Sequence, residues 1–405
     1  MTAEPASRDR LLTPTFVALA VATLVFYVAS GIVVTAAPLF GAQRLLLSKP
    51  EIGLAIAIFS VAALAMRPVV GWVTDRFGRR FALRTGAALT IVALVIHIPV
   101  TTLGAFVIAR ALLGAAEAFW LVAAIAAAAD LAPEGRRGEA LSFISLTLYV
   151  GLAVGPVMAE TILGASGSFA AVWLVTAAVA AIALGLAWVV PDIAPTEMGD
   201  VGPGPRRRPT RWSRLIHPAG LLPGLVILLG LSGMAYYLSF LPLYVRSIGL
   251  PGASLPLAEY GLVVVVLRLV GARLPDRLGA VALSGSALAA SAIGLGIIAA
   301  FPSLAGLLVG TGLFAFGVAF IMLALLALTV ARAPIAERGL AVATATLFID
   351  VSFGIAPVVL GAVAEIGGYP LGFVVAGAVS ALGALVLVAA FRARPAATTA
   401  ATLTR

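Results

Sequence analysis

The chain has 405 residues, of which 62% are hydrophobic and 11% are charged, and its formal net charge is +9. A water-soluble domain needs more polar surface than this composition provides, so we expect a polytopic, all-α membrane protein. The lack of cysteine excludes disulfides and thiolate sites, and two distant histidines, His97 and His217, predict no metal centre.

Twelve apolar stretches are each long enough to cross about 30 Å of hydrocarbon as a helix. In chain order they lie at 13–40, 52–72, 81–99, 103–131, 139–164, 168–190, 219–246, 254–274, 279–300, 303–331, 339–364 and 370–392. Residues 191–217 are rich in proline, glycine and arginine, and predict a linker between six-helix bundles at 13–190 and 218–392. Residues 1–12 and 393–405 are expected to be a cytoplasmic N-terminus and a disordered cytoplasmic tail.

Basic residues are distributed unequally between the two sides of these spans. If both termini are cytoplasmic, 20 arginines lie on the cytoplasmic side, and only Arg44, Lys49 and Arg246 lie outside. The positive-inside rule therefore predicts cytoplasmic N and C termini, and membrane topology accounts for the net charge without nucleic-acid binding. The excess of arginine over lysine indicates GC-rich coding, so we expect the cytoplasmic membrane of a bacterium.

The two halves repeat at a constant offset of 201 residues. The paired positions include Arg67 and Arg268, Asp75 and Asp276, Arg76 and Arg277, Gly78 and Gly279, Arg137 and Arg338, and Pro156 and Pro357. Duplicated units in membrane proteins commonly underlie alternating access, with the binding site near mid-membrane at their interface.

Three motifs in the first half resemble those of the major facilitator superfamily of transporters. The junction of the second and third spans carries Gly71, Asp75, Arg76, Gly78, Arg79 and Arg80, and 274–280 repeats it in degraded form. Arg110 and Gly114 resemble its fourth-helix motif, and Gly151, Gly155 and Pro156 resemble its antiporter motif. The chain is thereby identified as a member, similar to 12-span drug/proton antiporters. The resemblance implies two pseudo-symmetric six-helix bundles and a monomer, driven by a proton gradient without a cofactor.

The resemblance also implies a gate at the cytoplasmic side. In this family the junction residues latch the two halves together in the outward-open state, and Arg79 resembles an arginine that pairs with an acid, here Asp130. The equivalent positions in the second half, 201 residues later, are both alanine, Ala280 and Ala331, so the pair is lost together there. The expected gate also contains Arg137, Asp276 and Arg277. The alternative is that these charges only enforce topology.

Five ionisable residues lie deep within spans, namely Glu117, Asp350, Arg110, Arg67 and Arg268. Such a residue costs at least a few kcal/mol and indicates function by default. Glu117 and Asp350 lie near mid-membrane, where burial favours the neutral carboxyl group that a proton carrier requires; the alternative is permanent pairing with an arginine of another helix. Arg67 and Arg268 recur in both halves, which favours structural clamps as much as substrate binding. The second half has threonine in place of Arg110, which favours a role in coupling.

Other polar and aromatic residues have weaker interpretations. Glu160 and Glu365 lie near the outer ends of their spans and are expected to be solvated. The resemblance places several aromatic residues on cavity-lining helices, although packing is the alternative: Phe26, Tyr27, Trp120, Tyr236, Tyr237, Phe240 and Phe348.

The sequence contains no nucleotide-binding loop and no evident nucleophile and base, so we do not expect an enzyme. The leading hypothesis is a proton-coupled exporter of small amphipathic organic molecules, with protons, substrate and the lipid bilayer as its partners. An uptake carrier, a facilitator or a lipid-type transporter remains open. From another class, a non-transporting membrane receptor or scaffold is the alternative.

Overall fold

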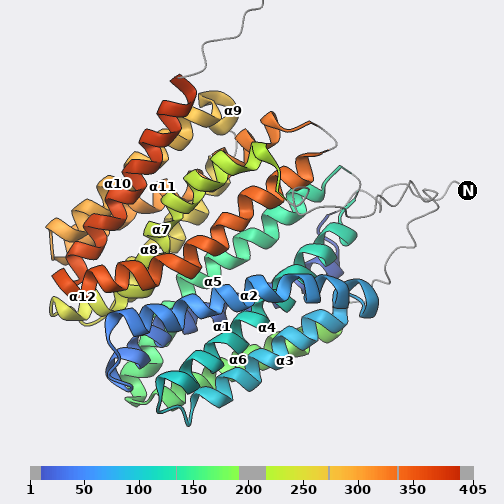
Figure 1. The fold of residues 1–405 in the computed structure, drawn as a ribbon. Helices are drawn as coiled ribbons and strands as arrows, with labels where there is room; N and C mark the ends of the chain where they lie inside the picture. Colours follow the sequence, from blue (N-terminus) through green and yellow to red (C-terminus); the bar gives the residue numbers. More distant parts are fainter. Residues whose placement is uncertain (1–10, 134, 191–215, 272–273, 335–336, 393–405) are drawn as a thin grey trace, which may run out of the picture.

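A computed structural model describes residues 11–133, 135–190, 216–271, 274–334 and 337–392 (Figure 1). Every regular element in these ranges is a helix. The first half contains α1 (Pro14–Gln43), α2 (Lys49–Phe77), α3 (Arg79–His97), α4 (Leu103–Leu131), α5 (Arg137–Ser166) and α6 (Phe169–Val189). The second half contains α7 (Pro218–Ser247), α8 (Ser254–Val270), α9 (Leu274–Leu278), α10 (Ala280–Ala300), α11 (Leu304–Arg332) and α12 (Arg338–Arg392). The predicted terminal segments, the linker and the tail lie almost entirely outside the described residues.

Ten of the described helices are long and apolar enough to span a membrane. Two features account for the difference between these ten helices and the 12 predicted spans. Helix α12 has 55 residues, and its backbone leaves the helical region at Gly367 and Gly368, so it consists of two helical segments. Helix α8 has 17 residues and is about 26 Å long, at the lower limit for a span.

The two halves form separate bundles that lie side by side, coloured blue to green and yellow to red in Figure 1. Each has its own apolar core, although Leu39, Ile52, Tyr149 and Leu152 of the first half join the core of the second. Helix α2 packs against α12, α5 against α8, and α1 against α7. Because the 201-residue offset relates α2 to α8 and α5 to the first segment of α12, the first two interfaces are pseudo-symmetric equivalents.

The two ends of the bundles differ in charge. We call one the arginine-rich end, where α2 meets α3, α4 meets α5 and α11 meets α12; it carries Arg76, Arg79, Arg80, Arg136, Arg137, Arg332 and Arg338. We call the other the opposite end, where α1 meets α2, α5 meets α6 and α7 meets α8. Of the basic residues, Arg44, Lys49 and Arg246 lie there.

The junction of α2 and α3 is shorter than the sequence predicted. Helix α2 was expected to end at 72 but continues to Phe77, and Gly78 alone separates it from α3. Gly78 has a φ of 89°, a conformation that glycine adopts without steric cost. Asp75 and Arg76 are therefore helical, because helix capping rather than loss of apolar character ends the helix.

Candidate functional site

Glu117 lies in the middle of α4, 14 residues from both Leu103 and Leu131, or about 21 Å from each end. Its Oε2 accepts a hydrogen bond from Ser30 Oγ of α1 at 3.2 Å. In the described part of the chain, no basic side chain forms an ion pair with Glu117. The carboxylate is partly buried and has a hydroxyl group as its hydrogen-bond donor.

Arg110 lies two turns from Glu117 and makes other contacts. Its side chain is buried, and its Nε donates to the carbonyl oxygen of Ala55 in α2 at 3.2 Å. The guanidinium lies 4.9 Å from the ring centroid of Phe59, also in α2. Arg110 therefore joins α4 to α2 within the first bundle.

Asp350 and Arg67 pair with each other across the bundle interface. Arg67 Nη1 lies 2.7 Å from Asp350 Oδ2, and Nη2 donates to Oδ1 at 3.0 Å. The Asp350 side chain is 11% exposed and that of Arg67 is 38% exposed. The contact combines one hydrogen bond, to Oδ1, with a close approach of opposite charges at Oδ2, and it joins α2 to α12.

Arg268 makes the equivalent contact at the other interface. Its guanidinium carbon lies 4.4 Å from the ring centroid of Tyr149, joining α8 to α5. The offset relates Arg268 to Arg67 and Tyr149 to Asp350. Repeat-related positions therefore form an ion pair at one interface and a cation–π contact at the other.

Most of the expected cavity aromatics are packed inside the bundles. The side chains of Phe26, Tyr27, Trp120, Tyr236, Tyr237 and Phe240 are at most 2% exposed. Phe26 stacks on Trp120 with centroids 4.4 Å apart, and the Tyr237 hydroxyl bonds to Thr311 at 3.0 Å. Such rings fill space between helices, which fits the packing alternative; only Phe348 keeps partial exposure.

A charge cluster at the arginine-rich end joins α2, α3 and α4. Arg79 Nε donates to Asp130 Oδ2 at 3.0 Å, and Nη1 donates to Asp75 Oδ1 at 3.2 Å and to the Thr74 carbonyl at 3.0 Å. The structure thus brings together the expected pair, within one bundle. Arg76 lies 5.7 Å from the rings of Trp72 and Phe77.

The other residues of the expected gate are not brought to this cluster. Arg137 and Arg277 are exposed, and the Asp276 side chain lies outside the described part of the chain. A Cβ at Gly71 would meet no atom within 4 Å, so the space beside Gly71 is open.

The glycines of the fifth helix serve close packing against α1. A Cβ at Gly151 would overlap the backbone of Tyr27, and one at Gly155 would overlap Gly31. Pro156 follows them, buried inside α5. In the second half the corresponding serines, Ser232 and Ser352, approach with their Oγ atoms 3.4 Å apart. Small residues permit this close crossing of membrane helices.

Glu160 and Glu365 contact the other bundle, which the sequence interpretation did not foresee; Glu365 is exposed, as expected, and Glu160 is partly buried. Glu160 accepts hydrogen bonds from the backbone N–H groups of Ala253 at 2.7 Å and Ser254 at 3.2 Å. Glu365 accepts from the backbone N–H of Lys49 at 3.1 Å and from its Nζ at 3.4 Å. Sequence alone does not reveal such partners, because they lie on distant helices.

Sequence analysis also missed Glu259, an ionisable residue within α8. Its Oε2 is buried without a hydrogen-bond partner, and a Cβ at Gly312 of α11 would lie 3.2 Å from its Oε1. The sequence could have revealed Glu259 as a candidate, because it is a carboxylate inside the predicted span 254–274.

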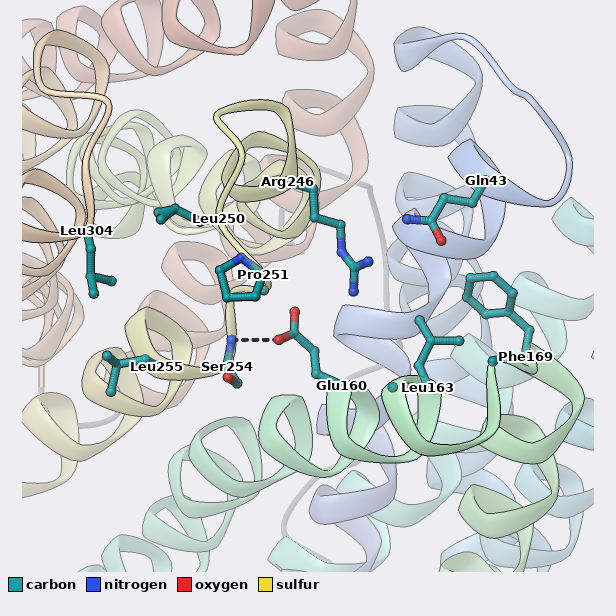
Figure 2. A pocket seen from close by; sticks show the side chains of 13 residues that line it. Gln43, Glu160, Leu163, Phe169, Arg246, Leu250, Pro251, Ser254, Leu255 and Leu304 are labelled. Atoms are coloured by element: carbon teal, nitrogen blue, oxygen red, sulfur yellow. Dashed lines mark hydrogen bonds between the residues drawn. The ribbon is translucent and has the colours of Figure 1, made fainter.

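A cavity of about 480 Å³ lies at the opposite end, between the bundles (Figure 2). Glu160 and Phe169 line it from the first bundle, and Arg246, Leu250 and Leu255 from the second. In Figure 2 the Arg246 guanidinium projects toward Glu160, which bonds to Ser254. The buried Nε of Arg246 has no hydrogen-bond partner.

Comparisons with known proteins identify relatives across nearly the whole chain. Residues 19–290 and 252–404 match the family described as Major Facilitator Superfamily. An uncharacterised MFS-type transporter of Salmonella typhimurium is 25% identical over 393 residues, covering 95% of this chain and 98% of the relative. Among solved structures, the nucleoside transporter NupG superposes with a TM-score of 0.73 at 16% identity, covering 94% of this chain and 100% of NupG. A bacterial homologue of the human lysosomal transporter Spinster, inward-facing and unoccupied, gives 0.72 at 15% identity, covering 96% of each chain. These structural likenesses show the fold.

Proposed function

Because the chain belongs to the major facilitator superfamily, we propose that it is a proton-coupled secondary transporter that exports small amphipathic organic molecules by alternating access. It has no enzyme role in this proposal. The steps below assign the residues that would carry protons and close the transport path.

The proposed topology has 12 spans with both termini in the cytoplasm. Division of α12 at Gly367 and Gly368, together with a short span at α8, supports this number. An even number of spans places both termini on one side, and the positive-inside rule assigns the arginine-rich end to the cytoplasm. The opposite end then faces outside.

The conformation corresponds to an inward-facing state in this proposal. The contacts of Glu160 with α8 and of Glu365 with α2 lie at the outer end, and the pair of Arg67 and Asp350 lies near mid-membrane, on the cytoplasmic side of the midpoints of α2 and the first segment of α12. On the cytoplasmic side of these contacts, Ser142 and Ser145 of α5 are exposed. Exposed serines within a membrane helix fit a water-filled opening to the cytoplasm.

The unpaired carboxylate of Glu117 is the observation that carries the proton-coupling proposal. It lies at mid-depth with Ser30 as its hydrogen-bond donor, in a region where an ionised group without a cation is costly. Uptake of a proton removes that cost, so Glu117 can alternate between the two forms. Asp350 is the weaker candidate, because Arg67 already balances its charge.

The Arg79 cluster forms the proposed cytoplasmic gate. In the inward-facing state it is held within the first bundle by Asp75 and Asp130. As the bundles rock toward the outward-facing state, their cytoplasmic ends approach, and this cluster is then placed to meet the second bundle.

An uptake carrier is the second candidate, because a nucleoside transporter shares the fold. The direction of coupling separates the candidates: an exporter exchanges substrate for protons, whereas a proton-driven carrier moves both in the same direction. A receptor or scaffold would produce no substrate-dependent flux.

Proton movement in proteoliposomes with an internal pH dye tests the proposal. Cationic, zwitterionic and anionic amphiphiles and nucleosides would be added to vesicles of known orientation. Glu117→Gln is the test variant, and Glu139→Gln is its matched control, because exposed Glu139 pairs with Arg136 at the end of α5. We expect a substrate-triggered pH change that Glu117→Gln abolishes and Glu139→Gln retains. Tracer flux without any pH change would contradict proton coupling.

A further inference from the structure

Two carboxylates at the outer end hold the bundles together in a repeated arrangement. Glu160 lies in the last two turns of α5 in the first bundle and contacts the start of α8 in the second. Glu365 ends the first segment of α12 in the second bundle and contacts the start of α2 in the first. The repeat relates these helix pairs, so each bundle supplies one carboxylate and one helix N-terminus. We propose that Glu160 and Glu365 form a two-part outer gate that keeps the transporter inward-facing.

The contact of Glu160 satisfies an otherwise uncapped helix start. Helix α8 has Ala253 at its N-cap position and lacks a side-chain cap of its own. Both carboxylate oxygens of Glu160 accept from the first backbone N–H groups, at Ala253 and Ser254. A negative charge at this position also interacts favourably with the helix dipole. The first bundle therefore completes a helix of the second.

The contact of Glu365 uses the same chemistry at α2. Its Oε2 accepts from the backbone N–H of Lys49, the first helical residue, and lies 3.4 Å from Lys49 Nζ. The cap inside the bundle is separate, since Ser48 pairs with Glu51. The Lys49 Nζ also lies 5.3 Å from the ring centroid of Tyr369.

Glycine at two positions allows these close approaches. A Cβ at Gly252 would overlap the Glu160 carboxylate, so any larger residue there displaces it. Gly361 is the residue of the second half that is equivalent to Glu160 by the 201-residue offset, and it lies against the backbone of Lys49. Gly252 does not have a left-handed backbone, so alanine suits its conformation and would disturb only the contact.

Opening of the outer end requires both carboxylates to leave the opposing helix starts. Arg246 lines the cavity beside Glu160 and has a buried Nε without a partner. Because Arg246 belongs to α7 of the second bundle, its positive charge favours the closed contact with Glu160 and moves away with α8 when the bundles part.

This inference rests on the proposed alternating access but is independent of substrate and coupling ion. The cysteine-free chain allows pairs of spin labels to report distances between the bundles in nanodiscs. Thr101→Cys with Pro302→Cys reports the outer end; both residues are exposed and related by the repeat. Gly138→Cys with Gly339→Cys reports the cytoplasmic end, where a side chain at either position meets no atom within 4 Å.

Glu160→Gln and Glu365→Gln are expected to raise the ratio of outward-facing to inward-facing molecules by about tenfold, the effect of weakening a charge-assisted hydrogen bond. Outer distances lengthen and cytoplasmic distances shorten together, which a loss of stability alone would not cause. Glu51→Gln is the matched control, because Glu51 caps α2 from within its own bundle at the same end. Gly252→Ala keeps the charge of Glu160 but displaces its carboxylate from the start of α8, and we expect the same shift toward outward-facing molecules.

Distances in Glu160→Gln and Gly252→Ala that match those of Glu51→Gln would overturn the gate. The distance measurement is made without substrate, so its result is separate from that of the proton assay. A shift in distances with no proton movement would support the gate while contradicting proton coupling. Normal coupling with unchanged distances would contradict the gate alone.

Discussion

Glu117 and Asp350 lie at similar depths but have different partners. Asp350 has an arginine at 2.7 Å across the interface, whereas Glu117 has Ser30 at 3.2 Å in the neighbouring helix. The sequence predicted both residues as proton carriers, because it shows only how deep each residue lies along its helix and not which side chains surround it. The side-chain partners separate a clamp from a candidate proton site.

Ser30→Ala should slow proton-coupled transport. The serine hydroxyl is the hydrogen-bond donor to the Glu117 carboxylate, and its removal leaves that carboxylate without this partner. We expect the substrate-triggered proton flux to fall by about tenfold, the effect of losing a hydrogen bond to a charged group. The internal pH dye measures this flux. Thr85→Ala is the control, since Thr85 makes an exposed hydrogen bond to the Phe81 carbonyl of its own helix; equal fluxes in both variants would exclude the role of Ser30.

At the scale of helices, the antiporter-type motif has a packing role in this structure. Gly151 and Gly155 bring α5 against α1, and the positions of these glycines were visible in the sequence. Their partner helix was not, because four-residue spacing of small residues identifies an interface without naming the helix across it.

Gly155→Ala should destabilise the first bundle by about 1–3 kcal/mol, because the added methyl overlaps the backbone of Gly31. Gly164→Ala is the matched control in the same helix, since no atom lies within 4 Å of the added carbon. We expect a lower thermal midpoint in detergent for Gly155→Ala, and an unchanged or slightly raised one for Gly164→Ala. Equal midpoints would show that α1 and α5 are not in close contact.

At the scale of the molecule, two repeat-related contacts join the bundles at mid-depth. Arg67 pairs with Asp350, and Arg268 stacks on Tyr149. They add polar contacts to the apolar ones that Leu39, Ile52 and Leu152 make with the core of the second bundle. The asymmetry in their chemistry shows that duplication preserved the arginines while their partners diverged.

A double-mutant cycle should detect the coupling between Arg67 and Asp350. Arg67→Gln and Asp350→Asn each leave one unpaired charge at mid-depth, whereas the double variant leaves neither. We expect both single variants to lose stability and the double variant to recover about 1–2 kcal/mol of the summed loss. Additive changes in the free energy of unfolding would show that the pair contributes no net coupling.

Sidedness is the second prediction for the whole molecule. In intact bacterial cells, a membrane-impermeant thiol reagent should label Thr101→Cys, whereas Gly138→Cys should react only after permeabilisation. The positive-inside rule places the arginine-rich end, with Gly138, in the cytoplasm. The opposite labelling pattern would invert the topology and exchange the proposed outer and cytoplasmic gates.

The sequence alone determined the membrane class, the duplicated halves, the approximate helix positions and the charge difference between the two ends. These are properties of local composition and of the spacing between positions, which a chain displays before it folds. Helix ends were less predictable, as at Phe77, where a cap extends the helix beyond its apolar stretch.

Only the tertiary structure decided which charges are partners. Arg67 and Asp350 are 283 residues apart, and Glu160 and Ala253 are 93 apart. Their contacts depend on the rotation and register of packed helices, which small residues such as Gly252 and Gly261 permit at the interface. An unpaired charge is costly in an apolar interior, so the packing of the helices decides which charges are paired, as Arg67 is, and which have no ion-pair partner among the described residues, as is the case for Glu117.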